Sequence, residues 1–108
     1  MFVAAADERM IPGHRIELEA AHREAIGRLG SEPGFLGSRL LHFAGGPYRY
    51  IWEMNWVSRE EWQAFFESER FATLREPIDA ELSEPFSLTL YNVPVASGWR
   101  APQQGAGG

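Results

Sequence analysis

The sequence predicts an α+β fold whose elements follow one another as β-α-β-β-α-β. Three observations lead to this order. A helical hydrophobic repeat separates two apolar runs, the connection "GGP" joins two alternating segments, and a second helical region precedes a last alternating segment. This order is that of the ferredoxin-like fold, a four-stranded antiparallel sheet with its helices on one face. At 108 residues the chain is expected to form one domain over residues 1–96, followed by a flexible Gly/Pro/Gln-rich tail over 97–108.

The first strand and first helix are expected in residues 1–29. "MFVAAA" is apolar and is interpreted as a strand that stops at Asp7, with "DERMIPG" as the turn that follows it. A helix is predicted from about Pro12 to Leu29, because apolar residues recur there at spacings of three and four. Gly30 is the type of residue that ends a helix.

The rest of the chain is expected to hold a hairpin, a second helical region and a last strand. The hairpin pairs "FLGSRLLHFA", residues 35–44, with "YRYIWEMNW", residues 48–56. Ser58 and Glu61 match a capping box, and Trp62, Phe65 and Phe66 form one apolar stripe. A second helical piece is predicted from Ser68, which Pro77 should disturb, and "PFSLTLYNVPV" is the last strand.

Apolar residues occur in both alternating phases of these strands. One phase of residues 48–56 is almost wholly aromatic, and the other contains Ile51 with charged and amide groups. In residues 35–43, Phe35, Leu41 and Phe43 are expected opposite Leu36 and Leu40. Because helices cover one face of the sheet only, the other face needs a partner, and a homodimer with facing sheets is the simplest solution.

Composition excludes several classes of partner and chemistry. The net charge of −5 disfavours nucleic acid and anionic membrane surfaces. The absence of cysteine excludes disulfides, thiolate ligands and thiol nucleophiles, and suits a cytoplasmic protein. The N-terminal residues do not have the pattern of a signal peptide, and no segment reaches the roughly 20 apolar residues needed to cross a bilayer. His14 and His22 lie eight residues apart with no obvious third ligand, so no metal is predicted.

Two stretches carry a family resemblance. "PGFLGSRLL" and "YIWEMNWVSREEWQAFFESERFATLRE" contain a Pro-Gly-Phe-Leu start to one strand, Trp56 at the end of the next, and a Ser-x-Glu-x-aromatic helix start. Over roughly residues 2–95 the chain resembles the antibiotic biosynthesis monooxygenase family of the dimeric α/β barrel superfamily. The resemblance implies a dimeric α/β barrel and, in one branch, cofactor-independent oxygenation of aromatic polyketides.

The resemblance also implies candidate residues. The haem-degrading branch is disfavoured, because its Trp and His positions fall on Phe65 and Arg75. The quinone-forming monooxygenases are matched by Trp56 and Arg75, but their strand Asn falls on Trp52, and Asn55 lies in the opposite phase. The expected pocket walls and substrate-binding residues are Tyr50, Trp52, Trp56, Phe65 and Tyr91.

Three residues are candidates for catalysis. Arg75 would hold a developing oxyanion, since a guanidinium is always charged. His42 is a candidate base because histidine titrates near neutrality, although it lies one residue out of register with the family's His. Glu53 is either a base or the structural partner of Arg39 or Arg49 across the hairpin.

The leading hypothesis is a homodimeric monooxygenase that needs no cofactor. It would oxidise a polycyclic phenol or anthrone with dioxygen to a quinone-type product. A cyclase or isomerase of the same fold, and a protein that only binds small hydrophobic ligands, remain as alternatives.

Overall fold

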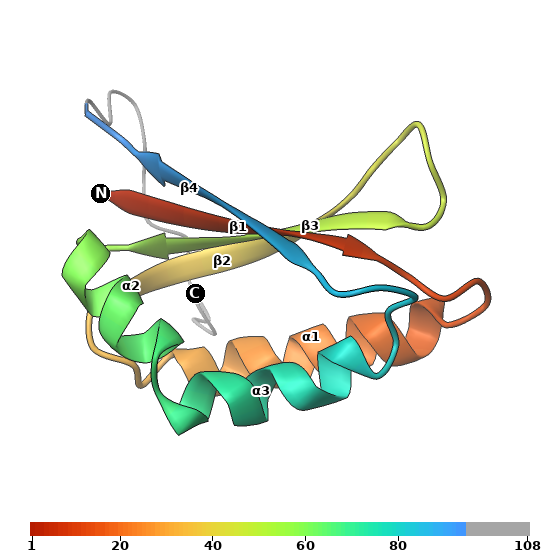
Figure 1. Ribbon diagram of the computed structural model, residues 1–108, viewed down its shortest axis with the longest axis horizontal. Helices are drawn as coiled ribbons and strands as arrows, with labels where there is room; N and C mark the ends of the chain where they lie inside the picture. Colours follow the sequence, from red (N-terminus) through yellow and green to blue (C-terminus); the bar gives the residue numbers. More distant parts are fainter. Residues whose placement is uncertain (95–108) are drawn as a thin grey trace.

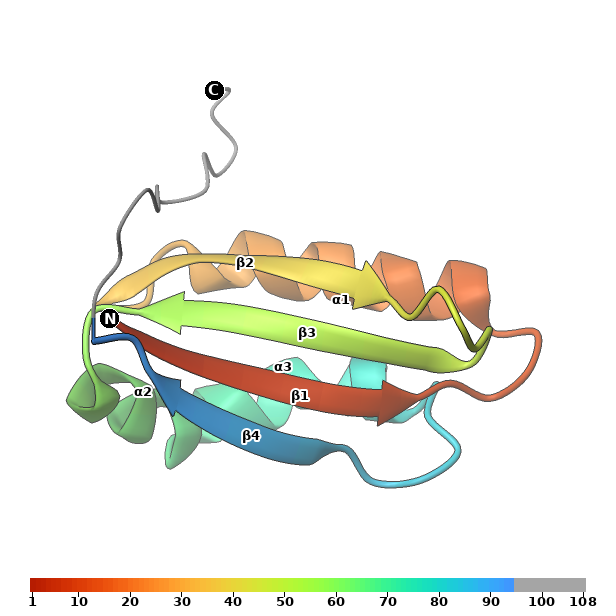
Figure 2. The same cartoon turned by 90° about the horizontal axis from the view of Figure 1, so that it is seen from above.

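The computed structural model describes residues 1–94 as a four-stranded antiparallel sheet with three helices on one face. The expected tail over 97–108 lies outside the described residues. Figure 1 shows the two layers, and Figure 2 shows the strand order β2-β3-β1-β4. The elements are β1 (Phe2–Arg9), α1 (Arg15–Leu29), β2 (Phe35–His42), β3 (Arg49–Trp56), α2 (Arg59–Phe66), α3 (Glu69–Asp79) and β4 (Ser87–Asn92). The predicted ferredoxin-like fold is therefore confirmed.

Strand β1 is longer than the apolar run that predicted it. It continues to Arg9, because Asp7, Glu8 and Arg9 still pair with β3. Its buried side chains alternate, as a half-buried strand requires: they are Phe2, Ala4, Ala6 and Glu8. The prediction that the strand stops at Asp7 was wrong, because backbone pairing with β3 continues past this first charged residue to Arg9.

A bulge near the start of β2 changes the faces predicted for this strand. Phe35 pairs with Trp56, but Gly37 pairs with Asn55, so Leu36 is an extra residue without an opposite neighbour. Gly37 has a φ of 150°, which side chains rarely allow. Phe35 therefore packs on Trp56 in the core while Leu41 lies opposite Ile51 on the other face. The expectation that Phe35 and Leu41 share a face was wrong, since an extra residue reverses the alternation.

The second helical region consists of α2 and α3. Ser68 is the N-cap of α3 and accepts a hydrogen bond from the backbone N–H of Phe71. Ser58 precedes α2, but its hydroxyl bonds to the Glu61 carboxylate and caps no backbone N–H. Helix α3 runs through Pro77 to Asp79, so the proline does not end it.

The sheet has one face covered by helices and one face without them. The aromatic phase of β3 faces the helices, where Tyr50, Trp52 and Trp56 are at most 1% exposed. The helix-free face carries apolar residues together with the ion pairs Arg39–Glu53 and Arg49–Asp7. Leu41 and Tyr91 remain 37% and 52% exposed there. The helix-free face is thus a mixed surface that a single copy of the chain leaves open.

Candidate functional site

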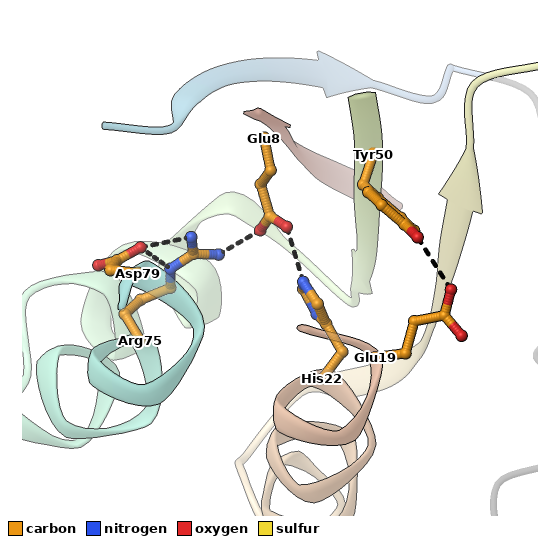
Figure 3. A network of polar contacts seen from close by, with 6 residues as sticks. All are labelled: Glu8, Glu19, His22, Tyr50, Arg75 and Asp79. Atoms are coloured by element: carbon orange, nitrogen blue, oxygen red, sulfur yellow. Dashed lines mark hydrogen bonds and ion pairs between the residues drawn. The ribbon is translucent and has the colours of Figure 1, made fainter. Parts of the chain in front are cut away.

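A carboxylate lies at the centre of the layer between sheet and helices. Glu8 is 0% exposed and is bonded on both oxygens. Arg75 Nη1 donates to Glu8 Oε2 at 2.6 Å, and His22 Nε2 lies 2.7 Å from Glu8 Oε1. Arg75 also donates to Asp79 Oδ1 at 3.2 Å from Nε and 2.7 Å from Nη2. Figure 3 shows this network of one strand residue and residues from two helices.

The hydrogen bonds decide which nitrogen of His22 carries a proton. A carboxylate accepts only, so Nε2 of His22 donates to Glu8. In the neutral imidazole, Nδ1 then holds a lone pair. That atom is buried and has no hydrogen-bond partner among the described residues. His22 is therefore oriented by Glu8 and keeps an unused basic nitrogen.

Aromatic rings surround this network. The His22 ring meets Trp52 edge-on with centroids 4.8 Å apart. The Arg75 guanidinium carbon lies 3.9 Å from the centroid of the Phe86 ring and 5.9 Å from that of Trp52. Burying an ion pair in such surroundings gives little net stability compared with apolar packing. A buried charged cluster beside a groove is therefore a candidate functional site.

An open groove of about 310 Å³ lies beside the network, between α1 and the edge strand β2. The lining side chains from α1 are one turn apart, and those from the sheet lie near the end of the hairpin. They are Glu19, His22, Arg23, Ile26, Leu40, His42 and Tyr50. His22 is the member of the buried network that lines this groove. It therefore connects the buried Glu8–Arg75 pair with a space that a ligand can occupy.

Tyr50 closes the floor of the groove. Its hydroxyl donates to Glu19 Oε2 at 2.9 Å (Figure 3), and its ring is 1% exposed. Burial, with the hydrogen bond to Glu19 second, raises the pKa of Tyr50 from 10.0 to about 12. The pKa of Glu19 is lowered, first by its hydrogen bond to Arg15 and then by that to Tyr50. Tyr50 is thus a neutral phenol whose proton is committed to Glu19.

His42 forms the outer wall of the groove. Its ring stacks on Tyr50 with centroids 4.5 Å apart and planes 9° apart. Its Nε2 lies 2.9 Å from the carbonyl oxygen of Pro47. A carbonyl only accepts, so Nε2 carries the proton and Nδ1 is the basic atom of neutral His42.

The structure separates the residues that the sequence marked as candidates. His42 and Tyr50 line the groove, while Trp52 and Arg75 lie in the buried layer behind it. Phe65 and Trp56 pack together farther along the same layer, with centroids 5.3 Å apart.

Glu53 and Tyr91 lie on the helix-free face, away from the other candidates. Arg39 Nε donates to Glu53 Oε1 at 2.9 Å, so the predicted cross-hairpin partner is present. Tyr91 lies with Glu53 and Asn55 around a shallow depression of about 520 Å³. The structure therefore does not bring the three predicted catalytic residues, His42, Glu53 and Arg75, into one site.

Glu8 and His22 are the site residues that sequence reasoning missed. Glu8 continues the buried phase of Phe2, Ala4 and Ala6, and His22 lies in the buried stripe of α1 between Leu18 and Ala25. A lone acid on the apolar face of a strand and a histidine on the apolar face of a helix were the available signals. The prediction that β1 ends at Asp7 placed Glu8 outside the strand, so its position on the apolar face was not recognised.

The described part of the chain offers neither a metal site nor a membrane span. Within residues 1–94, no group of three or more His, Asp or Glu side chains is placed to hold a metal ion. None of the helices in this range is long and apolar enough to cross a membrane.

Solved structures share this fold at low sequence identity. A structure described as a putative antibiotic biosynthesis monooxygenase from Bordetella bronchiseptica is 20% identical with a TM-score of 0.79, and the match covers 87% of this chain and 97% of that one. A second, from Nitrosomonas europaea, is 20% identical with a TM-score of 0.75 and coverage of 88% and 100%. A mutant of SnoaB from Streptomyces nogalater, described as a cofactor-independent oxygenase, is 14% identical with a TM-score of 0.74 and coverage of 91% and 98%. Identities this low show the fold alone.

A search of curated proteins finds no match. The family profile named antibiotic biosynthesis monooxygenase matches residues 1–77, which include β1, α1, the hairpin, α2 and most of α3. The buried network and the groove lie almost wholly within this range. The chain belongs to the antibiotic biosynthesis monooxygenase family.

Proposed function

We propose that this protein is a cofactor-independent monooxygenase that converts a polycyclic phenol or anthrone to a quinone-type product. The observation that carries the proposal is the buried Glu8–His22–Arg75 network beside the α1–β2 groove. It supplies a base, a group that orients the base, and a fixed positive charge in an apolar layer. The description of SnoaB as a cofactor-independent oxygenase supports the choice of reaction.

The reaction balances without an external reductant. A base removes a proton from the anthrone methylene and leaves an enolate. The enolate transfers one electron to dioxygen, and the two radicals combine to form a carbon–oxygen bond and a peroxide anion, which is protonated. Loss of the second methylene proton and cleavage of the oxygen–oxygen bond give a carbonyl and water. The substrate supplies all four electrons, so one oxygen atom enters the product and the other leaves in water.

We assign the proton transfer to His22. Nδ1 is its unused basic nitrogen, and Glu8 fixes the ring and balances the charge of the imidazolium that forms. His42, on the same groove, is the alternative base.

Arg75 lies behind the groove and is proposed to act through Glu8, whose carboxylate it fixes for the hydrogen bond to His22. Three of the five N–H bonds of its guanidinium donate to Glu8 and Asp79, which holds the guanidinium in place between these two carboxylates. The rings of Trp52 and Phe86 exclude water from the guanidinium, which strengthens its attraction to a negative charge.

We also propose that two copies pair through the helix-free face. Val3, Ala5, Ile51 and Tyr91 line the shallow depression of this face, and Leu41 adds apolar surface beside them. Facing sheets would bury these side chains and would complete the dimeric α/β barrel expected from the sequence.

Oxygen consumption tests the proposal. The protein is mixed with an anthrone, such as dithranol, in buffer with a metal chelator and no added flavin or haem, and oxygen uptake and quinone formation are recorded against the rate without protein. We expect uptake and quinone in equal amounts, with a rate that falls by about 100-fold or more in the variant His22→Gln. No acceleration over the spontaneous rate across a panel of anthrones and polycyclic phenols would refute the oxygenase.

An anaerobic arm separates the oxygenase from an isomerase. The same base would serve a cyclase or isomerase, which removes and returns a proton and needs no oxygen. Turnover of a polyketide-type substrate that continues under argon would favour that second activity, whereas the oxygenase must stop.

A further inference from the structure

We propose that the α1–β2 groove binds planar aromatic molecules that carry a carboxylate, and that Arg23 is the residue that recognises the carboxylate. The inference rests on the proposed function in taking this groove as the substrate site. It goes further in naming a charged substituent that the reaction itself does not require.

Arg23 stands out among the arginines. Seven of the nine arginines in residues 1–94 lie within ion-pair distance of a carboxylate, in a chain with 15 acidic residues. Arg23 and Arg59 are the two without such a partner in this range. Arg59 lies on α2 beside Glu60 and Gln63, whereas Arg23 lies on the groove, one residue after His22. An unpaired guanidinium in a groove is available to a carboxylate ligand, with which it forms two parallel hydrogen bonds.

The acid that precedes Arg23 by one turn on the same side of α1 is already engaged, and Glu24, the next residue along the chain, pairs with Arg28. Glu19 precedes Arg23 by one helical turn and also lines the groove. Its Oε2 accepts hydrogen bonds from Arg15 Nε at 2.9 Å and from the Tyr50 hydroxyl at 2.9 Å. Because Arg15 balances the charge of Glu19, the positive charge of Arg23 is left uncompensated at the mouth of the groove.

The remaining walls fit a flat apolar body. Ile26 from α1 and Leu40 from β2 are half-buried on opposite sides of the groove, and the stacked rings of Tyr50 and His42 form its floor and outer wall. His22, which also lines the groove, is 1% exposed, and its Nδ1 has no hydrogen-bond partner among the described residues. A ring system between Ile26 and Leu40 would thus have its reacting end toward His22 and its carboxylate toward Arg23.

Binding of unreactive quinones tests this independently of turnover. Anthraquinone carboxylate and the matching anthraquinone carboxamide have nearly the same shape and differ in charge. Calorimetric titration of the full chain at low ionic strength should show the carboxylate bound more tightly, by about five- to tenfold, as expected for a partly screened Arg–carboxylate pair. The variant Arg23→Gln should remove this preference while binding the carboxamide within about twofold of the wild type. Arg59→Gln, the matched control, should change neither affinity.

The location of the ligand has its own readout. The chain contains three histidines: His22 and His42 line the groove, and His14 pairs with Glu81 outside it. The carboxylate ligand should therefore shift the imidazole NMR signals of His22 and His42 and leave that of His14 in place.

The outcomes separate this inference from the proposed reaction. Equal affinity for the two quinones, equal loss of both in Arg23→Gln, failure to bind either ligand, or shifts confined to His14 would each overturn the inference. If the carboxylate preference is found but no anthrone is oxidised, the recognition by Arg23 stands and the oxygenase falls. If neutral anthrones are oxidised and Arg23→Gln has no effect on either ligand, the reverse holds.

Discussion

Replacing Glu8 by leucine removes a carboxylate that is fully buried and accepts hydrogen bonds from Arg75 and His22. Arg75 then keeps only Asp79, whose side chain is 46% exposed, as its counter-ion. Removing one partner of a buried ion pair costs about 3–5 kcal/mol, and the remaining Asp79 places the expected loss near the lower value, about 3 kcal/mol. Arg75→Met leaves Glu8 with the His22 donor alone and should cost about the same.

The double variant Glu8→Leu, Arg75→Met is the informative one. Leucine and methionine fill similar volumes without a charge, and replacing a buried ion pair by apolar residues is often neutral. His22 loses its partner in this variant, which costs about 1–2 kcal/mol for an unsatisfied buried group. We therefore expect the double variant to lie about 1–2 kcal/mol below the wild type, whereas independent effects would give about 6 kcal/mol.

Guanidinium chloride unfolding followed by far-UV circular dichroism measures these differences. The dependence of the free energy of unfolding on denaturant should be the same for all four proteins, so that the comparison is between equally compact states. A double variant as unstable as the sum of the single ones, or single variants within about 0.5 kcal/mol of the wild type, would refute the view that Glu8 and Arg75 form a coupled buried pair. The double variant should nevertheless fail to consume oxygen with an anthrone.

Three further predictions concern other parts of the chain. The pKa of Tyr50 is raised from 10.0 in the unfolded chain to about 12 in the folded protein. The contribution of Tyr50 to the free energy of unfolding is therefore fully present below pH 10.0 and is lost as the pH rises from 10.0 to about 12. The loss should not exceed about 2 kcal/mol, since solvent at the 33% exposed Glu19 screens part of it, and urea unfolding of Tyr50→Phe should lack this alkaline phase. In the oxygen assay, His22→Gln should lose about 100-fold or more of kcat, and Glu53→Gln less than about twofold. The opposite order would show that Glu53, on the helix-free face, is the base. Ile51→Asp should convert the proposed dimer to a monomer in light scattering, and a wild type that is already monomeric would contradict the pairing of sheets.

The order of elements could be predicted from the sequence because each element has a local signal. The helical repeat before Gly30, the "GGP" connection and the alternation of β3 all depend on neighbours within a few residues. The fold confirmed them. The strand boundaries were less certain, since β1 continues through Asp7–Arg9 by pairing with β3, which is distant in the sequence.

The site was harder to predict because it is made by three distant elements. Glu8, His22 and Arg75 come from β1, α1 and α3 and meet only when the layer is assembled. Of these, Arg75 alone was expected, and on the basis of resemblance. The opposite faces of His42 and Glu53 follow from the register of the hairpin, where His42 pairs with Tyr50 and Arg39 with Glu53.

The extra residue Leu36 in β2 has a consequence for how relatives are compared with this chain. A homologue without this extra residue would keep the pairing of Gly37 onward with β3 and would alternate regularly from Phe35. Counted from Phe35, the homologue's residue at the position of Leu41 would then pair with Tyr50, as His42 does in this chain. An alignment without a gap at this position would therefore equate residues of opposite roles, and swapping strands between such homologues would need Leu36 to travel with its segment.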